Sequence, residues 1–116
     1  MGALTSLAIQ PTLKQITKGG QTMRGREWLG MTDISRMIYI MGIVEGWQGM
    51  LSLGEQFGNE TTTRLYKRVD TCTLPMTFNQ MRAIVDKYLK ENPSTSHLSM
   101  ESTAWAAFNR VCPSVL

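Results

Sequence analysis

The segment of residues 32–53 constrains the fold more than any other part of the chain, because on a helical wheel it is apolar on nearly all sides. Thr32 or Asp33 is a suitable N-cap for a helix that begins there. Such a helix has to lie at the centre of a bundle or bury a second face against a partner. Its main apolar arc comprises Tyr39, Ile40, Ile43, Val44, Trp47, Met50 and Leu51.

A second apolar group flanks the narrow polar strip of this helix, which contains Glu45, Gln48 and Ser52. Unless the last helix of the chain covers this group, a monomer would expose several of its side chains. Contiguous exposed apolar patches usually mark contacts with other molecules. We therefore predict a homodimer through this flank, which consists of Ile34, Met37, Ile38 and Met41.

Three glycines lie on one stripe of the same helix, where another backbone could approach closely. Glu45 and Gln48 make membrane dimerisation a poor explanation, and they also break any apolar run long enough to span a bilayer. We expect no membrane span and predict that soluble helices pack closely on the stripe, which consists of Gly42, Gly46 and Gly49.

The rest of the sequence predicts further helices and no strands. Residues 1–30 are interpreted as a loosely ordered arm with a short helical piece at residues 12–17, followed by a helical domain of residues 31–116. Residues 54–64 have the composition of a loop, and a short helical turn over residues 63–69 follows. The expected fold is therefore all-α, a small single-domain bundle of about four helices.

The last two of these helices have clear boundaries. Thr77 and Gln80 fit a capping box that opens a helix over residues 78–91, and Asn92-Pro93 ends it. Ser96 or Ser99 can cap a final helix that runs to about residue 111.

The distribution of charge argues against a nucleic-acid partner. The chain has a net charge of +3 and a pI of about 9.1. Residues 1–30 carry all of this excess, whereas residues 31–116 hold equal numbers of basic and acidic side chains. The predicted domain therefore has no surplus of positive charge to neutralise phosphates.

The residues that could carry chemistry are few. One histidine and two cysteines provide no zinc-binding spacing, and no glycine-rich phosphate loop follows a strand. We expect no cofactor, no metal and no enzymatic activity. A Cys72–His97 nucleophilic dyad stays open as an alternative, because the cysteine count fits two free thiols as well as one disulfide.

The C-terminal half resembles the Rap/Tai immunity-protein family. The resemblance begins with Cys72, Pro75, Thr77 and Gln80, continues through Ile84, Val85, Tyr88, Leu89, Asn92 and Pro93, and ends with His97, Ala104, Phe108, Cys112 and Pro113. The first helix adds Trp28, Arg36, Tyr39, Gly42, Glu45 and Gly46.

This resemblance implies a small helical protein of the Gram-negative periplasm, often dimeric, whose two cysteines are joined. Characterised members of the family bind and block peptidoglycan amidase toxins that are delivered by type VI secretion. We therefore predict a Cys72–Cys112 disulfide between positions just outside helices. No complete signal peptide is visible in the sequence, so the periplasmic location is expected from the resemblance alone.

Blocking an amidase cleft requires a rigid body and an exposed segment that fits the cleft. We predict two polar loops as partner-binding segments, and their candidate residues are Glu55, Asn59 and Glu60 in the first, and Asn92, Ser94, Thr95, Ser96 and His97 in the second. The second loop is preferred, as a loop that is not committed to the core. The alternative function is a periplasmic housekeeping or stress protein without a toxin partner.

Overall fold

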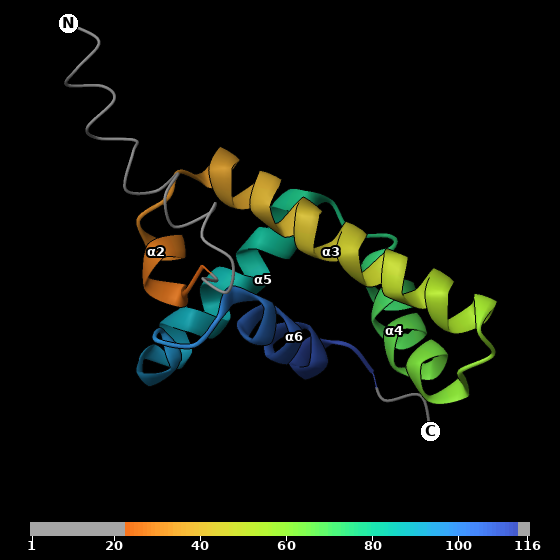
Figure 1. The fold of residues 1–116 in the computed structure, drawn as a ribbon. Coiled ribbons are helices and arrows are strands. Elements are labelled where there is room, and N and C mark those ends of the chain that lie inside the picture. The colour runs from red at the N-terminus through yellow and green to blue at the C-terminus, as the bar shows by residue number, and fades with distance from the viewer. Residues whose placement is uncertain (1–22, 114–116) are drawn as a thin grey trace, which may run out of the picture.

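Residues 23–113, the part of the chain that the computed structural model describes, form helices joined by short connections (Figure 1). An isolated β-bridge between Arg24 and Ser99 is the only β pairing within this part, so the predicted all-α class is confirmed. The helical piece expected at residues 12–17 lies outside the described residues. The elements are α2 (Gly25–Leu29), α3 (Asp33–Gln56), α4 (Glu60–Thr73), α5 (Phe78–Glu91), the 3-10 helix η1 (Pro93–Thr95) and α6 (Met100–Val111).

Side-chain caps explain where the four longer helices begin. Thr32 accepts a hydrogen bond from the backbone of Ser35 at the start of α3, and Asn59 and Ser99 cap α4 and α6 in the same way. The predicted capping box at the start of α5 is confirmed: the Gln80 backbone donates to Thr77 Oγ1 at 3.1 Å, and the Thr77 backbone donates to Gln80 Oε1 at 2.8 Å. These bonds satisfy amide groups that have no partner inside the helix.

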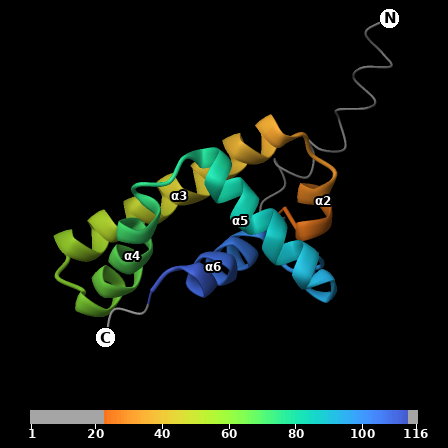
Figure 2. The same ribbon diagram turned by 180° about the vertical axis from the view of Figure 1, so that it is seen from behind.

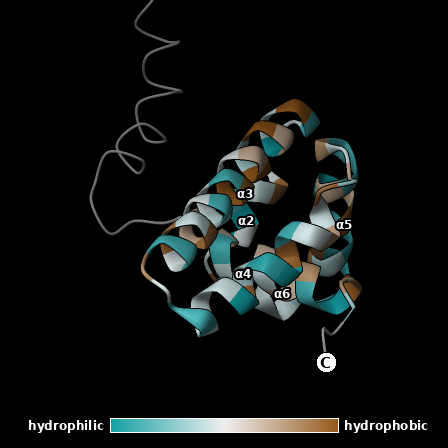
Figure 3. Cartoon of the chain, turned by 90° about the vertical axis from the view of Figure 1, so that its right-hand side faces the viewer, coloured by the Kyte–Doolittle hydropathy of each residue, from teal (hydrophilic) through white to brown (hydrophobic). Residues whose placement is uncertain are grey.

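The long helix α3 forms one side of the molecule, and the other helices pack beneath it. Its C-terminal half packs against α4, which returns along it, and α5 crosses its N-terminal half (Figures 1 and 2). Helix α6 packs against α5, and α2 packs against α6. Hydrophobic residues occur on successive turns of α3 (Figure 3). None of the described helices is long and apolar enough to cross a membrane.

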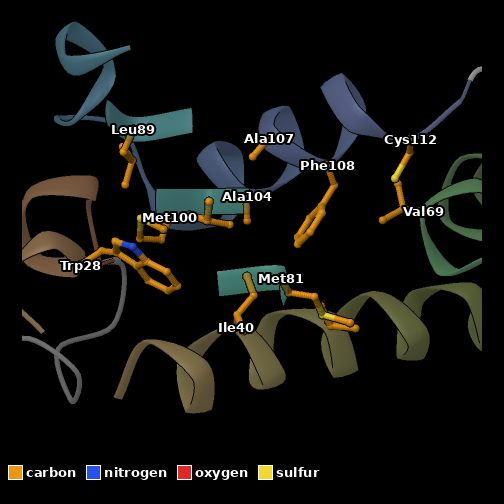
Figure 4. Close-up of a cluster of buried hydrophobic side chains, with 12 residues drawn as sticks. Trp28, Ile40, Val69, Met81, Leu89, Met100, Ala104, Ala107, Phe108 and Cys112 are labelled. Atoms are coloured by element: carbon orange, nitrogen blue, oxygen red, sulfur yellow. The ribbon is translucent and has the colours of Figure 1, made fainter. Parts of the chain in front are cut away.

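The core lies between α3, α5 and α6, with Trp28 of α2 closing one end (Figure 4). Ile40, Val85 and Phe108 are fully buried there. Removing this apolar surface from water is the main favourable contribution to folding. The other buried hydrophobic residues are Val44, Val69, Met81, Leu89, Met100, Ala104, Ala107 and Cys112.

The predicted disulfide is present between Cys72 and Cys112, with a Cα–Cα distance of 5.7 Å. Cys72 belongs to the last turn of α4, so the expectation that both cysteines lie outside helices is wrong for this one. The bridge joins the end of α4 to the C-cap of α6. With Cys72 in the bridge, no thiolate is available to the Cys72–His97 dyad.

The structure differs from the sequence interpretation at the end of the predicted arm. Residues 25–29 form α2, and the side chain of Trp28 is completely buried. The folded part of the chain therefore includes the last residues of the segment that was interpreted as loose.

The predicted loop of residues 54–64 is also mostly helical. Helix α3 continues to Gln56 and α4 begins at Glu60, which leaves a tight turn around Gly58 with φ of 67°. The close helix approach occurs at Gly54, where an added Cβ would lie 3.0 Å from Thr63 Oγ1. At Gly42, Gly46 and Gly49 an added Cβ would meet nothing within 4 Å, so the expected packing on that stripe is not found within the described chain.

Candidate functional site

Trp28 and Arg36, which are part of the family resemblance, meet two residues of α5 in a polar cluster that joins three helices. Trp28 Nε1 donates a hydrogen bond to Asp86 Oδ1 at 2.7 Å, and Arg36 Nη1 donates to the same oxygen at 3.1 Å. Arg82 binds the other carboxylate oxygen, and Arg36 also donates to the backbone oxygens of Trp28 and Leu29. We call Trp28, Arg36, Arg82 and Asp86 the anchor cluster. It holds α2 and α3 against α5 and has a structural role.

The preferred binding loop, residues 92–97, is tied to the rest of the fold. The backbone amide of Arg26 donates to Ser96 O at 3.1 Å, Asn92 Nδ2 donates to Tyr88 O, and Thr95 Oγ1 donates to Asn92 O. The expectation that this loop is uncommitted to the core is therefore wrong. Only part of it faces solvent freely, namely the exposed residues Pro93, Ser94 and His97.

The other predicted segment forms the turn between α3 and α4. Glu55 lies in the last turn of α3, Asn59 caps α4, and Glu60 is the first residue of α4; all three are exposed. Beside them lies a shallow hollow of about 650 Å³ whose lining also includes Arg64 and Lys67. The turn thus presents charges of both signs.

The two predicted segments do not come together. The α3–α4 turn and the connection between α5 and α6 lie at opposite ends of the molecule (Figures 1 and 2), whose longest dimension is 55 Å. A single cleft on a partner would therefore contact one of them and not both.

Two of the four residues in the predicted dimer flank are exposed, and the other two are half-buried. Ile34 and Ile38 are 66% and 62% exposed, whereas Met37 and Met41 are half-buried. The three exposed glycines Gly42, Gly46 and Gly49 continue the same side of α3. This side of α3 is the unpartnered face, and within the described residues no side chain approaches a Cβ built on its glycines.

Sequence reasoning missed an aromatic hollow between α3, α4 and α6. Trp105 contacts Trp47 and Tyr66, with ring centroids 5.1 Å and 5.3 Å away. Phe108 also contacts Trp47, with ring centroids 5.8 Å apart. The space that these rings border is shallow and open to solvent, with a volume of about 380 Å³. The aromatic hollow is lined by Trp47, Tyr66, Glu101, Ser102, Trp105 and Ala106.

A carboxylate gives this hollow a negative charge. Glu101 is exposed in the first turn of α6, and none of the described basic side chains forms an ion pair with it. Burial, and secondarily the charge of Glu101, raise the pKa of Tyr39 above 10.0. The charge of Glu101 therefore also acts on Tyr39 of α3, which lies outside the lining of the hollow.

No group of histidine, cysteine or acidic side chains within residues 23–113 is arranged to hold a metal ion. Comparisons with protein families, with curated proteins and with solved structures find no match to this chain. The functional interpretation therefore depends on the sequence patterns described above and on the geometry of the residues.

Proposed function

We propose that this chain is a periplasmic immunity protein that binds a type VI secretion peptidoglycan amidase and blocks its active-site cleft. The closed Cys72–Cys112 bridge is the observation that carries the proposal, because such bridges persist in oxidising compartments such as the periplasm. The toxin class comes from the resemblance to the Rap/Tai family. Several residues of that resemblance serve the fold: Trp28 and Arg36 in the anchor cluster, and Thr77 and Gln80 in the capping box.

The anchored loop of residues 92–97 is our candidate for the blocking segment. Its backbone is fixed by hydrogen bonds to α2 and α5, so little conformational entropy is lost when it enters a cleft. Ser94 and His97 are exposed and can contact the enzyme, whereas the side chains of Asn92 and Thr95 form hydrogen bonds within the protein. We therefore assign the contact to Ser94 and His97.

The proposal is tested with any peptidoglycan amidase that is encoded beside the gene. Purified protein should suppress peptidoglycan cleavage at near-equal stoichiometry. The double variant Ser94→Glu/His97→Glu should lose inhibition while its free energy of unfolding changes by less than ~0.5 kcal/mol per site, as is usual for surface substitutions.

A matched control lies at the opposite end of the molecule. The variant Glu55→Lys/Glu60→Lys also changes two exposed side chains and should retain inhibition. Loss of inhibition in this control alone would move the blocking segment to the α3–α4 turn. Failure of the unmodified protein to bind any such amidase would refute the proposed function and leave the housekeeping alternative.

A further inference from the structure

The aromatic hollow presents ring surfaces from three helices together with one carboxylate. Trp47 comes from α3, Tyr66 from α4 and Trp105 from α6, and the ring planes of Trp47 and Trp105 are inclined by 82°. All three rings are half-buried, so they are held by the fold and still reach the surface. A ligand that enters the hollow would meet rings whose positions are already fixed.

The chemistry of the hollow matches a cation. The faces of tryptophan and tyrosine rings carry partial negative charge and attract cations that lie over them. Glu101 adds a full negative charge at the same place, and none of the described basic side chains neutralises it. A neutral apolar ligand would use the rings but would gain nothing from the carboxylate.

Among protein cations, a guanidinium group fits these features best. It is planar, it stacks on aromatic faces, and it loses its hydration more easily than an ammonium group. It can also donate paired hydrogen bonds to a carboxylate. We propose that the aromatic hollow binds the side chain of an arginine from the partner protein, with the guanidinium between the rings and Glu101. This inference rests on the proposed function in one respect, which is that the arginine belongs to a partner protein.

The ligand chemistry can be tested without the amidase. Isotope-labelled full-length protein is titrated with N-acetyl-arginine amide and followed by the NMR signals of the indole N–H groups. The Trp47 and Trp105 signals should shift and reach saturation, whereas the Trp28 signal should not move because its N–H is bound to Asp86. N-acetyl-citrulline amide, which has nearly the same shape without the charge, should cause much smaller shifts.

Two variants show whether the carboxylate contributes. Glu101→Gln should weaken binding of the arginine amide about threefold, the effect expected for an ion pair near the surface, and added salt should have a similar effect. Glu91→Gln is the matched control, because Glu91 is also an exposed helical residue but lies at the end of α5. It should leave the affinity unchanged.

Several results would overturn the inference. Equal shifts with citrulline amide would show apolar contact alone, and an unchanged affinity in Glu101→Gln would remove the carboxylate from the site. Saturable shifts with N-acetylglucosamine and none with arginine amide would assign the hollow to a sugar.

The link to the partner is tested in the complex with the amidase. Glu101→Gln should accelerate dissociation, while Glu60→Gln, at the α3–α4 turn and away from the blocking loop, should not. Dissociation that both variants leave unchanged would overturn the assignment of the hollow to that partner. If the chain binds arginine amide but no amidase, the proposed function fails while the chemistry assigned to the hollow stands.

Discussion

Replacing Asp86 by alanine should destabilise the protein more than any other single change to a charged residue of the anchor cluster. Asp86 accepts hydrogen bonds from Trp28 Nε1, Arg36 Nη1 and Arg82 Nη1. The side chains of both arginines are only 16% exposed, and that of Asp86 is 23% exposed. The alanine variant therefore leaves two guanidinium groups and an indole N–H without this acceptor in a mostly buried place.

The size of the effect follows from these contacts. A hydrogen bond to a charged group contributes about 1.5–3 kcal/mol, and removing one partner leaves the others desolvated. Because water still reaches part of the cluster, we expect a total loss of about 2–3 kcal/mol and not the larger cost of a fully buried pair. For a domain of this size that corresponds to a decrease in Tm of roughly 10 °C. Asp86→Asn should cost about half as much, because an amide oxygen still accepts a hydrogen bond.

Urea unfolding followed by circular dichroism measures the loss. Asp33→Asn is the matched control, since Asp33 is 71% exposed and lies 3.7 Å from Arg82; it should change stability by less than ~0.5 kcal/mol. A double-mutant cycle of Asp86→Ala with Trp28→Phe should give a coupling energy of about 1 kcal/mol for the indole hydrogen bond. If Asp86→Ala and Asp33→Asn have equal effects, the reasoning about the anchor cluster is wrong.

Three further predictions concern the bridge, the core and the unpartnered face. The free energy of unfolding of the double variant Cys72→Ser/Cys112→Ser should decrease by about 4 kcal/mol, because the bridge closes a loop with a sequence separation of 40 residues. Alkylation of the unreduced native protein should add no mass, and two adducts would contradict the bridge. The pKa of Tyr39 is raised in the folded state, so the neutral phenol contributes to stability. This contribution is complete below pH 10.0 and is lost as the pH rises through the higher pKa of the folded state. Ultraviolet titration should show Tyr39 ionising at lower pH in Glu101→Gln than in the unmodified protein, and identical curves would exclude the influence of that carboxylate. Light scattering should give twice the monomer mass of 13.0 kDa, and Ile38→Glu should reduce it towards the monomer; a monomer mass for the unmodified protein at high concentration would count against the dimer.

Elements whose boundaries are set by neighbouring residues could be predicted from the sequence. The helix of residues 78–91 agrees with α5 because Thr77 and Gln80 cap its start and Asn92-Pro93 follows its end. Ser99 likewise caps α6, as one of the two predicted positions. In each case the information lies within one helical turn.

Elements that depend on distant contacts were missed. The start of α4 consists largely of threonines, whose β-branched side chains favour helices weakly, and it packs against Gly54 of α3. The Asn59 cap is a local signal that the sequence interpretation overlooked. The short helix α2 begins with Gly25 and is followed by Gly30, and it is held in place by Asp86, which is 58 residues from Trp28 in the sequence. Helix propensity depends on each residue and its near neighbours, so it cannot predict either contact.

The candidate surfaces likewise include one that follows from a local pattern and one that depends on distant contacts. The wheel separated Ile34 and Ile38 from the main arc of α3, and the structure leaves both exposed. The aromatic hollow could not be predicted, because its rings come from three helices and follow no spacing along the chain. On a helical wheel Trp105 lies at the edge of the apolar face of residues 100–111, and this position is the one available signal.

The hydrogen bonds between α2 and the start of α6 have a consequence for the order in which the protein folds. Met100 N donates to Met23 O at 2.7 Å, and Gly25 N donates to Leu98 O at 3.2 Å, so the first described residues pair with the last helix. During synthesis the N-terminal segment emerges long before these partners exist, and contacts so distant in sequence form slowly. Trp28 cannot reach its acceptor Asp86, and Cys72 cannot pair with Cys112, until the segments that carry these partners have left the ribosome. The buried core of the described residues is therefore completed only late in synthesis, when the segment that forms α6 has emerged.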